Sequence, residues 1–238
     1  MKHKIKLLEE MAQQEHVFIM SFTESQLRSE ILSAEIAIRN FHVFRADRDD
    51  STRGGGVVMY IHENIATSCN VLATVSIGLV EYLIVYVSLL NMLIVSVYRS
   101  PYASAQDFLT ALEHIQAKID EMGAPTPTII LNGDFNFPII DWPSGSVYGG
   151  SESKRTQAQA LLRFANSNVL EQCVLRPTRE NNILDLLFTN NDQFVHSYRI
   201  DDTIVSDHRF ITVQTSIDFC NPVKDVGPTG DFASLIFF

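Results

Sequence analysis

The sequence is poor in cysteine and has no pair of cysteines at metal-binding spacing. Its three cysteines, Cys69, Cys173 and Cys220, are scattered along the chain. An odd number without a C-x-x-C pair excludes a thiolate metal site and favours a reducing, intracellular compartment. Glycine and proline are also sparse, at 11 and 8 of 238 residues, whereas 46% of the residues are hydrophobic. This composition excludes a disordered chain and suffices for one domain with a sizeable core.

An excess of positive charge is also lacking. The chain has 18 basic and 28 acidic residues, which gives a formal net charge of −10. A duplex-binding protein usually carries a basic excess, so this balance argues against tight, non-specific binding to DNA. It is compatible with an enzyme that meets phosphate through a divalent cation, because the ion reverses the local sign of the charge.

Segments that would direct the chain to a membrane are absent as well. Residues 1–10 carry too many charges for a signal peptide. The apolar run over residues 80–98 contains Glu81, Ser88 and Asn91 and is rich in valine and isoleucine. Its β-branched residues and central break predict two paired strands rather than a membrane-spanning helix. We therefore expect no membrane partner.

Hydrophobic periodicity predicts one mixed α/β domain over residues 1–220 and an unstructured tail over residues 221–238. Helices are expected at 4–14, 105–122 and 154–166, where apolar residues recur at helical spacing. Strands are expected at 17–20, 41–44, 57–61, 82–89, 92–98, 128–131, 183–188, 195–200 and 210–215. Helices and strands alternate in places, yet neighbouring strands also pair as hairpins. We therefore expect two packed sheets flanked by helices.

The stretch 128–136, Thr-Ile-Ile-Leu-Asn-Gly-Asp-Phe-Asn, is central to any functional interpretation. Residues 128–131 predict a buried strand that Asn132-Gly133 ends, and Asp134 and Asn136 follow it. A carboxylate and a carboxamide at the carboxyl end of a buried strand can hold and deprotonate a water, or bind a hard metal ion. Taken alone, the stretch is better explained as a turn, because Gly, Asp and Asn are common turn residues.

Other polar residues stand at or near the ends of predicted strands. Asp185 interrupts the strand at 183–188, and a buried carboxylate needs a polar site or a cation. Tyr98 is also compatible with simple filling of a sheet edge, and Asp207-His208 with a turn into a strand. The full set is Glu24, Tyr98, Asp134, Asn136, Asp185, Asp207 and His208. Carboxylates, an asparagine and a histidine without a serine or cysteine nucleophile favour metal-assisted phosphodiester cleavage.

Several short motifs follow one another in a characteristic order. They are Thr23-Glu24, Arg53-Gly-Gly-Gly-Val57, Val97-Tyr-Arg-Ser-Pro-Tyr102, Asn132-Gly-Asp-Phe-Asn136 with Trp142, Arg176-Pro-Thr-Arg179 followed by Leu184-Asp185, and Ser206-Asp-His208. Over residues 2–215 the chain resembles the endonuclease/exonuclease/phosphatase superfamily, and within it the AP-endonuclease-like domain of non-LTR (LINE-type) retrotransposons. No single motif is specific. Together they favour the active-site interpretation of Asp134 over the turn.

The resemblance implies a four-layered α/β sandwich with the active site at one edge of two sheets. It implies that Glu24 holds Mg²⁺, or Mn²⁺ in its place, with Asp207 beside the metal. Asp134 would activate the attacking water and Asn136 would steer it. The resemblance further implies that His208, held and kept charged by Asp185, stabilises the transition state. Tyr98 would donate a hydrogen bond to a phosphate oxygen, and Thr178 and Arg179 would contact DNA.

The sequence departs from this superfamily at its beginning. The resemblance implies a first strand that carries an asparagine beside the metal, and this strand is missing before Met1. We expect its loss to weaken activity and to expose the edge of a neighbouring strand. The sequence thus predicts a DNA-nicking endonuclease derived from a retrotransposon, nuclear if it acts on chromosomal DNA, and truncated. A phosphoesterase for small phosphorylated molecules and an inactive remnant are the alternatives.

Overall fold

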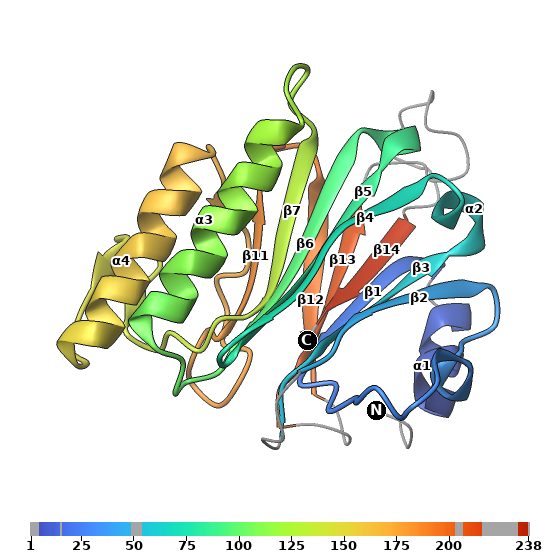
Figure 1. The fold of residues 1–238 in the computed structure, drawn as a ribbon, viewed down its shortest axis with the longest axis horizontal. Helices are drawn as coiled ribbons and strands as arrows, with labels where there is room; N and C mark the ends of the chain where they lie inside the picture. Colours follow the sequence, from blue (N-terminus) through green and yellow to red (C-terminus); the bar gives the residue numbers. More distant parts are fainter. Residues whose placement is uncertain (1–4, 15, 49–53, 203–206, 216–232, 238) are drawn as a thin grey trace.

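Two six-stranded β-sheets pack face to face in the computed structural model, which describes residues 5–14, 16–48, 54–202, 207–215 and 233–237 (Figure 1). The first sheet has the order β12–β13–β14–β1–β3–β2, with β1 (Val17–Thr23), β2 (Phe41–Ala46), β3 (Val57–His62), β12 (Val195–Asp201), β13 (Phe210–Thr215) and β14 (Ala233–Phe237). The second has the order β10–β11–β7–β6–β5–β4, with β4 (Cys69–Ile77), β5 (Val80–Val87), β6 (Met92–Arg99), β7 (Thr128–Asp134), β10 (Glu171–Gln172) and β11 (Asp185–Thr189). A small hairpin joins β8 (Ile140–Asp141) to β9 (Ser146–Val147).

Helices cover the two outer faces of this pair of sheets. The helical elements are α1 (Ile5–Gln14), α2 (Glu63–Ala66), α3 (Ala105–Glu121) and α4 (Glu152–Ser167), with short 3₁₀ turns at η2 (Ser33–Ile36) and η3 (Ser88–Leu90). In Figure 1, α3 and α4 lie side by side over the second sheet, and α1 lies against the first. The predicted pair of mixed sheets flanked by helices is therefore confirmed.

Three apolar layers follow from this arrangement. One fills the space between α3, α4 and the second sheet, and includes Phe108 and Leu161. A second lies between the two sheets, and a third lies between the first sheet and α1, where Leu8 is buried. Strand residues alternate between layers, as the two-residue repeat of a β-strand requires. No helix in the described part of the chain is long and apolar enough to cross a membrane.

The predicted hairpin in the apolar run is confirmed. β5 and β6 pair antiparallel along their whole length, and η3 joins them through Asn91, whose φ is 45°. Asparagine tolerates this left-handed conformation better than most residues. Within the chain order, the predicted helices also appear as α1, α3 and α4 with shifts of one or two residues at their ends.

The prediction that Asn132-Gly133 ends its strand is wrong. β7 continues through Gly133 to Asp134, and it pairs with β6 over its full length and with β11 from Ile130 to Asp134. Gly133 has a φ of 136°, and a Cβ atom at this position would lie 1.9 Å from the carbonyl oxygen of Val97. The glycine therefore permits a close approach of two strands.

The sequence also predicted too few strands. β4 was not expected; it lies at the edge of the second sheet, and its half-exposed residues give a weak hydrophobic pattern. The prediction of an unstructured tail is wrong for Ala233–Phe237, which forms β14. The expected open edge is wrong too, because β14 pairs with β1 on one side and β13 on the other, and β3 covers the second edge of β1.

Candidate active site

Three neighbouring strands of the second sheet bring polar side chains to one row. Asp134 of β7 is directly opposite Tyr98 of β6 and directly opposite Asp185 of β11. Directly paired residues project on the same face of a sheet. Here this is the face toward the first sheet, because Tyr98 belongs to the apolar layer between the sheets. The row is therefore built by strand register, and all three side chains are buried.

His208 comes from the first sheet and completes this row. It lies just before β13, and its Nδ1 atom is 2.9 Å from Oδ2 and 3.1 Å from Oδ1 of Asp185. Its Nε2 atom is 3.9 Å from Oδ2 of Asp134. Burial lowers the pKa of His208, but the hydrogen bond to Asp185 and the charges of both aspartates outweigh it and raise the pKa to about 9. At neutral pH the imidazole is therefore a cation that carries a proton on Nε2 as well as on Nδ1.

Asp134 is a carboxyl group under opposing influences. Burial raises its pKa well above the usual range, and the charges of Asp185 and Glu24 raise it further, whereas His208 and Asn136 lower it. Asn136 donates its backbone N–H to Oδ1 of Asp134 at 3.1 Å and its side-chain amide to Oδ2 at 2.7 Å. The same amide donates to the carbonyl of Arg99 at 3.0 Å, and Asn136 has a φ of 54°. Asn136 thus fixes the orientation of the Asp134 carboxylate.

Glu24 joins the site from the carboxyl end of β1. The hydroxyl of Tyr98 donates a hydrogen bond of 2.5 Å to Oε1 of Glu24. Burial raises the pKa of Tyr98 far above its usual value, and the negative charges of Glu24 and Asp134 act in the same direction. Tyr98 therefore remains a neutral hydrogen-bond donor, and Glu24 is within electrostatic range of Asp134.

A buried ion pair behind Tyr98 was not predicted from the sequence. Glu81, which is fully buried, accepts from Nε of Arg48 at 2.7 Å and from Nη2 at 3.0 Å. The guanidinium carbon of Arg48 lies 5.7 Å from the ring centroid of Tyr98. A Cβ atom at Gly55 would lie 2.4 Å from this carbon, so the glycine run makes room for Arg48. The carboxylate of Glu81 within an apolar strand was the one signal that a cation had to lie nearby.

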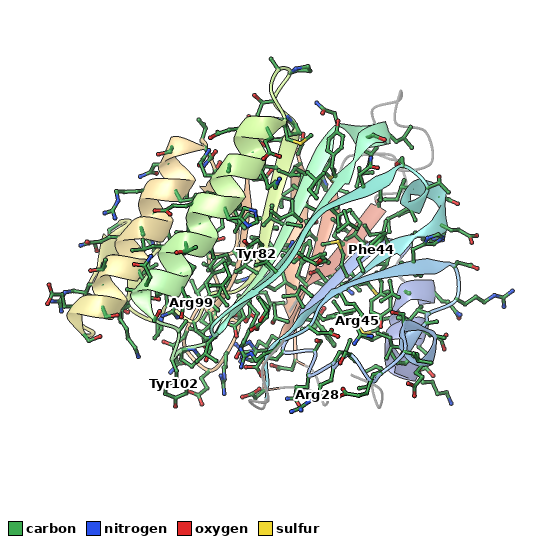
Figure 2. All side chains as sticks on the ribbon, in the orientation of Figure 1. Arg28, Phe44, Arg45, Tyr82, Arg99 and Tyr102 are labelled. Carbon is green, nitrogen blue, oxygen red and sulfur yellow. The ribbon has the colours of Figure 1, made fainter. Side chains whose placement is uncertain are left out.

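Arg99 is a second buried arginine that the sequence did not assign. Figure 2 shows it at the same end of the second sheet as the exposed Tyr102, and its guanidinium packs 4.1 Å from the ring centroid of Phe137. It donates from Nε to Gln157 at 2.8 Å and from Nη1 to the carbonyl of Phe135 at 3.1 Å. Through these two hydrogen bonds, Arg99 links the segment that follows Asp134 to α4.

A buried polar chain also connects the two sheets beneath the site. The hydroxyls of Ser21 and Ser96 are 2.6 Å apart, and Ser96 donates to Oδ1 of Asn132 at 3.0 Å. These residues come from β1, β6 and β7, and Ser96 and Asn132 stand two positions before Tyr98 and Asp134. Because strand residues two apart share a face, this chain lies one step deeper in the interface between the sheets.

The remaining predicted residues lie in two different environments. Asp207 is exposed and forms an ion pair with Arg179, which is also partly exposed. The structure does not bring the carboxylate of Asp207 into the group of Asp134, Asp185 and His208, whose ligand atoms lie within 4.8 Å of one another.

Thr178 differs from the prediction of a nucleic-acid contact. Its side chain is fully buried, and its hydroxyl accepts hydrogen bonds of 3.1 Å from the backbone N–H groups of Leu184 and Asp185. The hydroxyl is therefore not accessible to a nucleic acid in this structure. It fixes the start of β11 and thereby the position of Asp185.

The donor set suits a hard divalent cation. Such ions prefer carboxylate oxygens, and this site concentrates the carboxylates of Asp134, Asp185 and Glu24. Burial is the main reason that the pKa of Asp134 is raised, and the negative charges of Asp185 and Glu24 raise it further, so a cation at this site would be favoured by all three carboxylates. Because His208 holds a proton at neutral pH, it is better suited to donate a hydrogen bond than to coordinate a metal. The oxygens, rather than the imidazole, fit the ion.

Comparison with known proteins adds a family and a fold. Residues 92–212, just over half of the chain, match the family described as endonuclease-reverse transcriptase. No protein with a curated description matches. Among solved structures, an AP endonuclease from Leishmania major superposes with a TM-score of 0.62 at 12% identity, covering 87% of this chain and 81% of the other.

Two further solved structures share the fold. A 3′ phosphatase from Neisseria bound to a product DNA hairpin superposes with a TM-score of 0.61 at 15% identity, covering 90% of this chain and 94% of the other. The endonuclease domain of TRAS1, a telomere-specific non-LTR retrotransposon, gives a TM-score of 0.54 at 15% identity, covering 87% and 89%. At these identities the likeness concerns the fold.

Proposed function

Because this chain belongs to the endonuclease-reverse transcriptase family, within the endonuclease/exonuclease/phosphatase superfamily, we propose that it is a Mg²⁺-dependent endonuclease that nicks DNA. The observation that carries the proposal is the convergence of Asp134 and Asp185, on two paired strands of the second sheet, with His208, which stands just before β13 of the first sheet. Glu24 and Tyr98 stand beside them and are linked by a hydrogen bond.

Asp134 acts as the general base. Its raised pKa suits this role, because a carboxylate accepts a proton more readily when its conjugate acid is weaker. It takes a proton from a water whose oxygen attacks the phosphorus, and the bond to the leaving oxygen breaks as the new bond forms. Asn136 steers this step by holding both carboxylate oxygens of Asp134 in place.

His208 stabilises the negative charge that develops on the phosphoryl oxygens. Asp185 accepts from Nδ1 of His208 and keeps the ring protonated, which leaves Nε2 as the donor toward the substrate. Tyr98 offers its hydroxyl to a phosphate oxygen, in exchange for its present bond to Glu24. Both groups are held by buried neighbours before the substrate arrives.

Glu24 would hold the divalent cation, Mg²⁺ or Mn²⁺, next to the carboxylates of Asp134 and Asp185, and Asp207 would be a further ligand. When bound, the cation would supply positive charge that polarises the scissile phosphate. For Asp207 this role requires that its carboxylate leave Arg179, with which it is paired in this structure. Arg179 would then be released to contact a phosphate of the DNA backbone. A chain that acts on chromosomal DNA would work in the nucleus.

The test is nicking of supercoiled plasmid in the presence of Mg²⁺. We expect nicking by the full chain, a loss of at least about 100-fold in Asp134→Asn and His208→Ala, and no change in His42→Ala, an exposed histidine of β2. Replacing Mg²⁺ by Mn²⁺ should preserve nicking, and chelation should abolish it.

The result that contradicts the proposal is an intact plasmid at high protein concentration, with a cooperative thermal transition showing that the chain is folded. A parallel assay with small phosphomonoesters separates the main alternative. Turnover of these compounds, lost in His208→Ala, would assign the same site to a phosphatase.

A further inference from the structure

β14 occupies a central place in the first sheet although it comes last among the described strands. It pairs parallel with β1, where Ser21 faces Phe237, and antiparallel with β13, where Ile211 faces Phe237. All of its side chains are buried. Without β14, β1 and β13 would each present an unpaired edge inside the sheet.

The two neighbours of β14 are the strands that carry the catalytic groups of the first sheet. Glu24 directly follows β1, and His208 stands just before β13. Because β14 runs parallel to β1, its carboxyl end at Phe237 lies on the same side of the sheet as these groups. Adjacent strands lie about 4.8 Å apart, so β14 holds β1 and β13 at roughly twice that distance. Direct pairing of β1 with β13 would bring Glu24 and His208 one strand closer.

The side chains of β14 contact both apolar layers. Ala233, Leu235 and Phe237 face the interior between the sheets, in the same layer as Tyr98. Ile236 faces the opposite way, in the layer below α1 that includes Phe22. The slot between β1 and β13 therefore fits an extended segment with apolar residues on both faces.

A long stretch of sequence separates β14 from its neighbour β13. Thr215 at the end of β13 pairs with Ala233 at the start of β14, so a two-residue turn would suffice to join them. Instead, residues 216–232 lie between the two strands in the sequence. The seating of β14 must therefore come from its own pairing and packing rather than from a short turn.

We propose that residues 233–237 act as an internal peptide ligand, seated in an exchangeable strand slot between β1 and β13, and that this seating sets the position of Glu24 relative to His208. The consequence for catalysis rests on the proposed nuclease function; the strand slot itself does not. The occupant is this chain's own segment, and the same sequence supplied as a separate peptide should fill the slot in its place.

The test uses the full chain with Leu235→Asp, which places a carboxylate between the sheets, and Leu32→Asp, at an exposed leucine outside β14, as a matched control. Amide hydrogen exchange is measured in β1 and β13, and nicking is measured in parallel. We expect exchange at least about tenfold faster in both strands for Leu235→Asp alone, because their edges lose a partner. Nicking should fall with it, and Leu32→Asp should match the unmodified chain.

Exchange of the ligand is tested by adding a peptide of sequence Asp-Phe-Ala-Ser-Leu-Ile-Phe-Phe, corresponding to residues 231–238, with a short lysine extension for solubility. It should bind the Leu235→Asp chain, restore slow exchange in β1 and β13, and restore nicking. The same peptide with aspartate in place of its leucine should do neither. The milder Leu235→Ala chain should show a partial defect that the peptide also corrects.

Two outcomes overturn the proposal. Unchanged exchange in β1 and β13 of Leu235→Asp would show that β14 does not fill the slot. A defect in both Leu235 variants that the peptide fails to correct would show that β14 is a fixed part of the fold and not an exchangeable ligand. If the unmodified chain does not nick DNA, the proposed function fails, whereas peptide binding and amide exchange still decide the strand proposal.

Discussion

The hydroxyl of Tyr98 donates to Glu24 across the interface between the two sheets, with β6 on one side and the end of β1 on the other. The bond couples the buried row of Tyr98, Asp134 and Asp185 to the exposed rim that carries Glu24.

Tyr98→Phe should reduce nicking far more than it reduces stability. The phenylalanine keeps the ring packing and removes only the donor, so the free energy of unfolding should fall by about 0.5–1.5 kcal/mol. If the Tyr98 hydroxyl serves the phosphate as proposed, its loss should lower kcat by roughly 100-fold. Urea unfolding and single-turnover nicking measure the two effects. A loss of activity that merely tracked the loss of folded protein would contradict the assigned role.

The metal-free protein should lose stability as pH rises from neutral to alkaline values. Folding raises the pKa of His208 from 6.5 to about 9, so its stabilising contribution is complete below pH 6.5 and is lost as pH rises through 9. The contribution is on the order of 3 kcal/mol at most. Asp134, whose pKa is also raised, loses stabilisation in the same direction.

The measurement is urea unfolding in EDTA at pH 6 and at pH 9.5, for the unmodified chain and for His208→Gln. The difference between the two proteins should be large at pH 6 and should disappear at pH 9.5. A difference that grew with pH would mean that folding lowers the pKa of His208.

Arg48→Met should destabilise the chain by about 3–5 kcal/mol, because it leaves the Glu81 carboxylate buried without its partner. Replacing both residues, as Arg48→Met with Glu81→Leu, should recover most of this loss. Nicking should stay low in the double variant, because the guanidinium above the Tyr98 ring is still missing. A double-mutant cycle with chemical unfolding and nicking assays measures both, and additive losses of stability would argue against the pair.

Thr178→Val should lower the stability of the chain, whereas Arg179→Ala should lower its affinity for DNA. The valine has nearly the same shape but accepts no hydrogen bond, so two buried N–H groups are orphaned at a cost of about 1–3 kcal/mol. Arg179→Ala should leave stability nearly unchanged, weaken binding of a DNA duplex, and reduce the salt dependence of that binding by about one counterion. Thermal unfolding and fluorescence anisotropy at several salt concentrations distinguish them. Weaker DNA binding by Thr178→Val at full stability would restore the original prediction for Thr178.

Local patterns in the sequence were sufficient for most of the fold. Each element predicted in this way has a hydrophobic pattern within its own residues, which can be recognised without knowing what the element packs against. Examples are the buried strands β5, β6 and β7 and the amphipathic helices α3 and α4. β14 was missed for a different reason. A short apolar segment after a long polar stretch gives no sign of its partner, and here the partners are β1 and β13.

The candidate site shows the same division between local and distant information. Asp134 and Asn136 are two residues apart in the chain and form hydrogen bonds with each other, so the sequence alone could reveal their motif. The pairing of Arg48 with Glu81, and the burial of Thr178 beneath Asp185, depend on segments that meet only after folding. The unexplained carboxylate of Glu81 pointed to a missing cation without identifying it.

The contact between Ser21 and Ser96 has a consequence for how the molecule can move. Each sheet contributes one hydroxyl to this contact. If one sheet slid past the other, these hydroxyls and Asn132 would lose their hydrogen bonds in an apolar interior. A sliding movement that would misalign Glu24 with Tyr98 therefore costs free energy. In the proposed nuclease, the exposed segments at the rim would adjust to the substrate, while the buried residues below Tyr98 and Asp134 would keep their alignment.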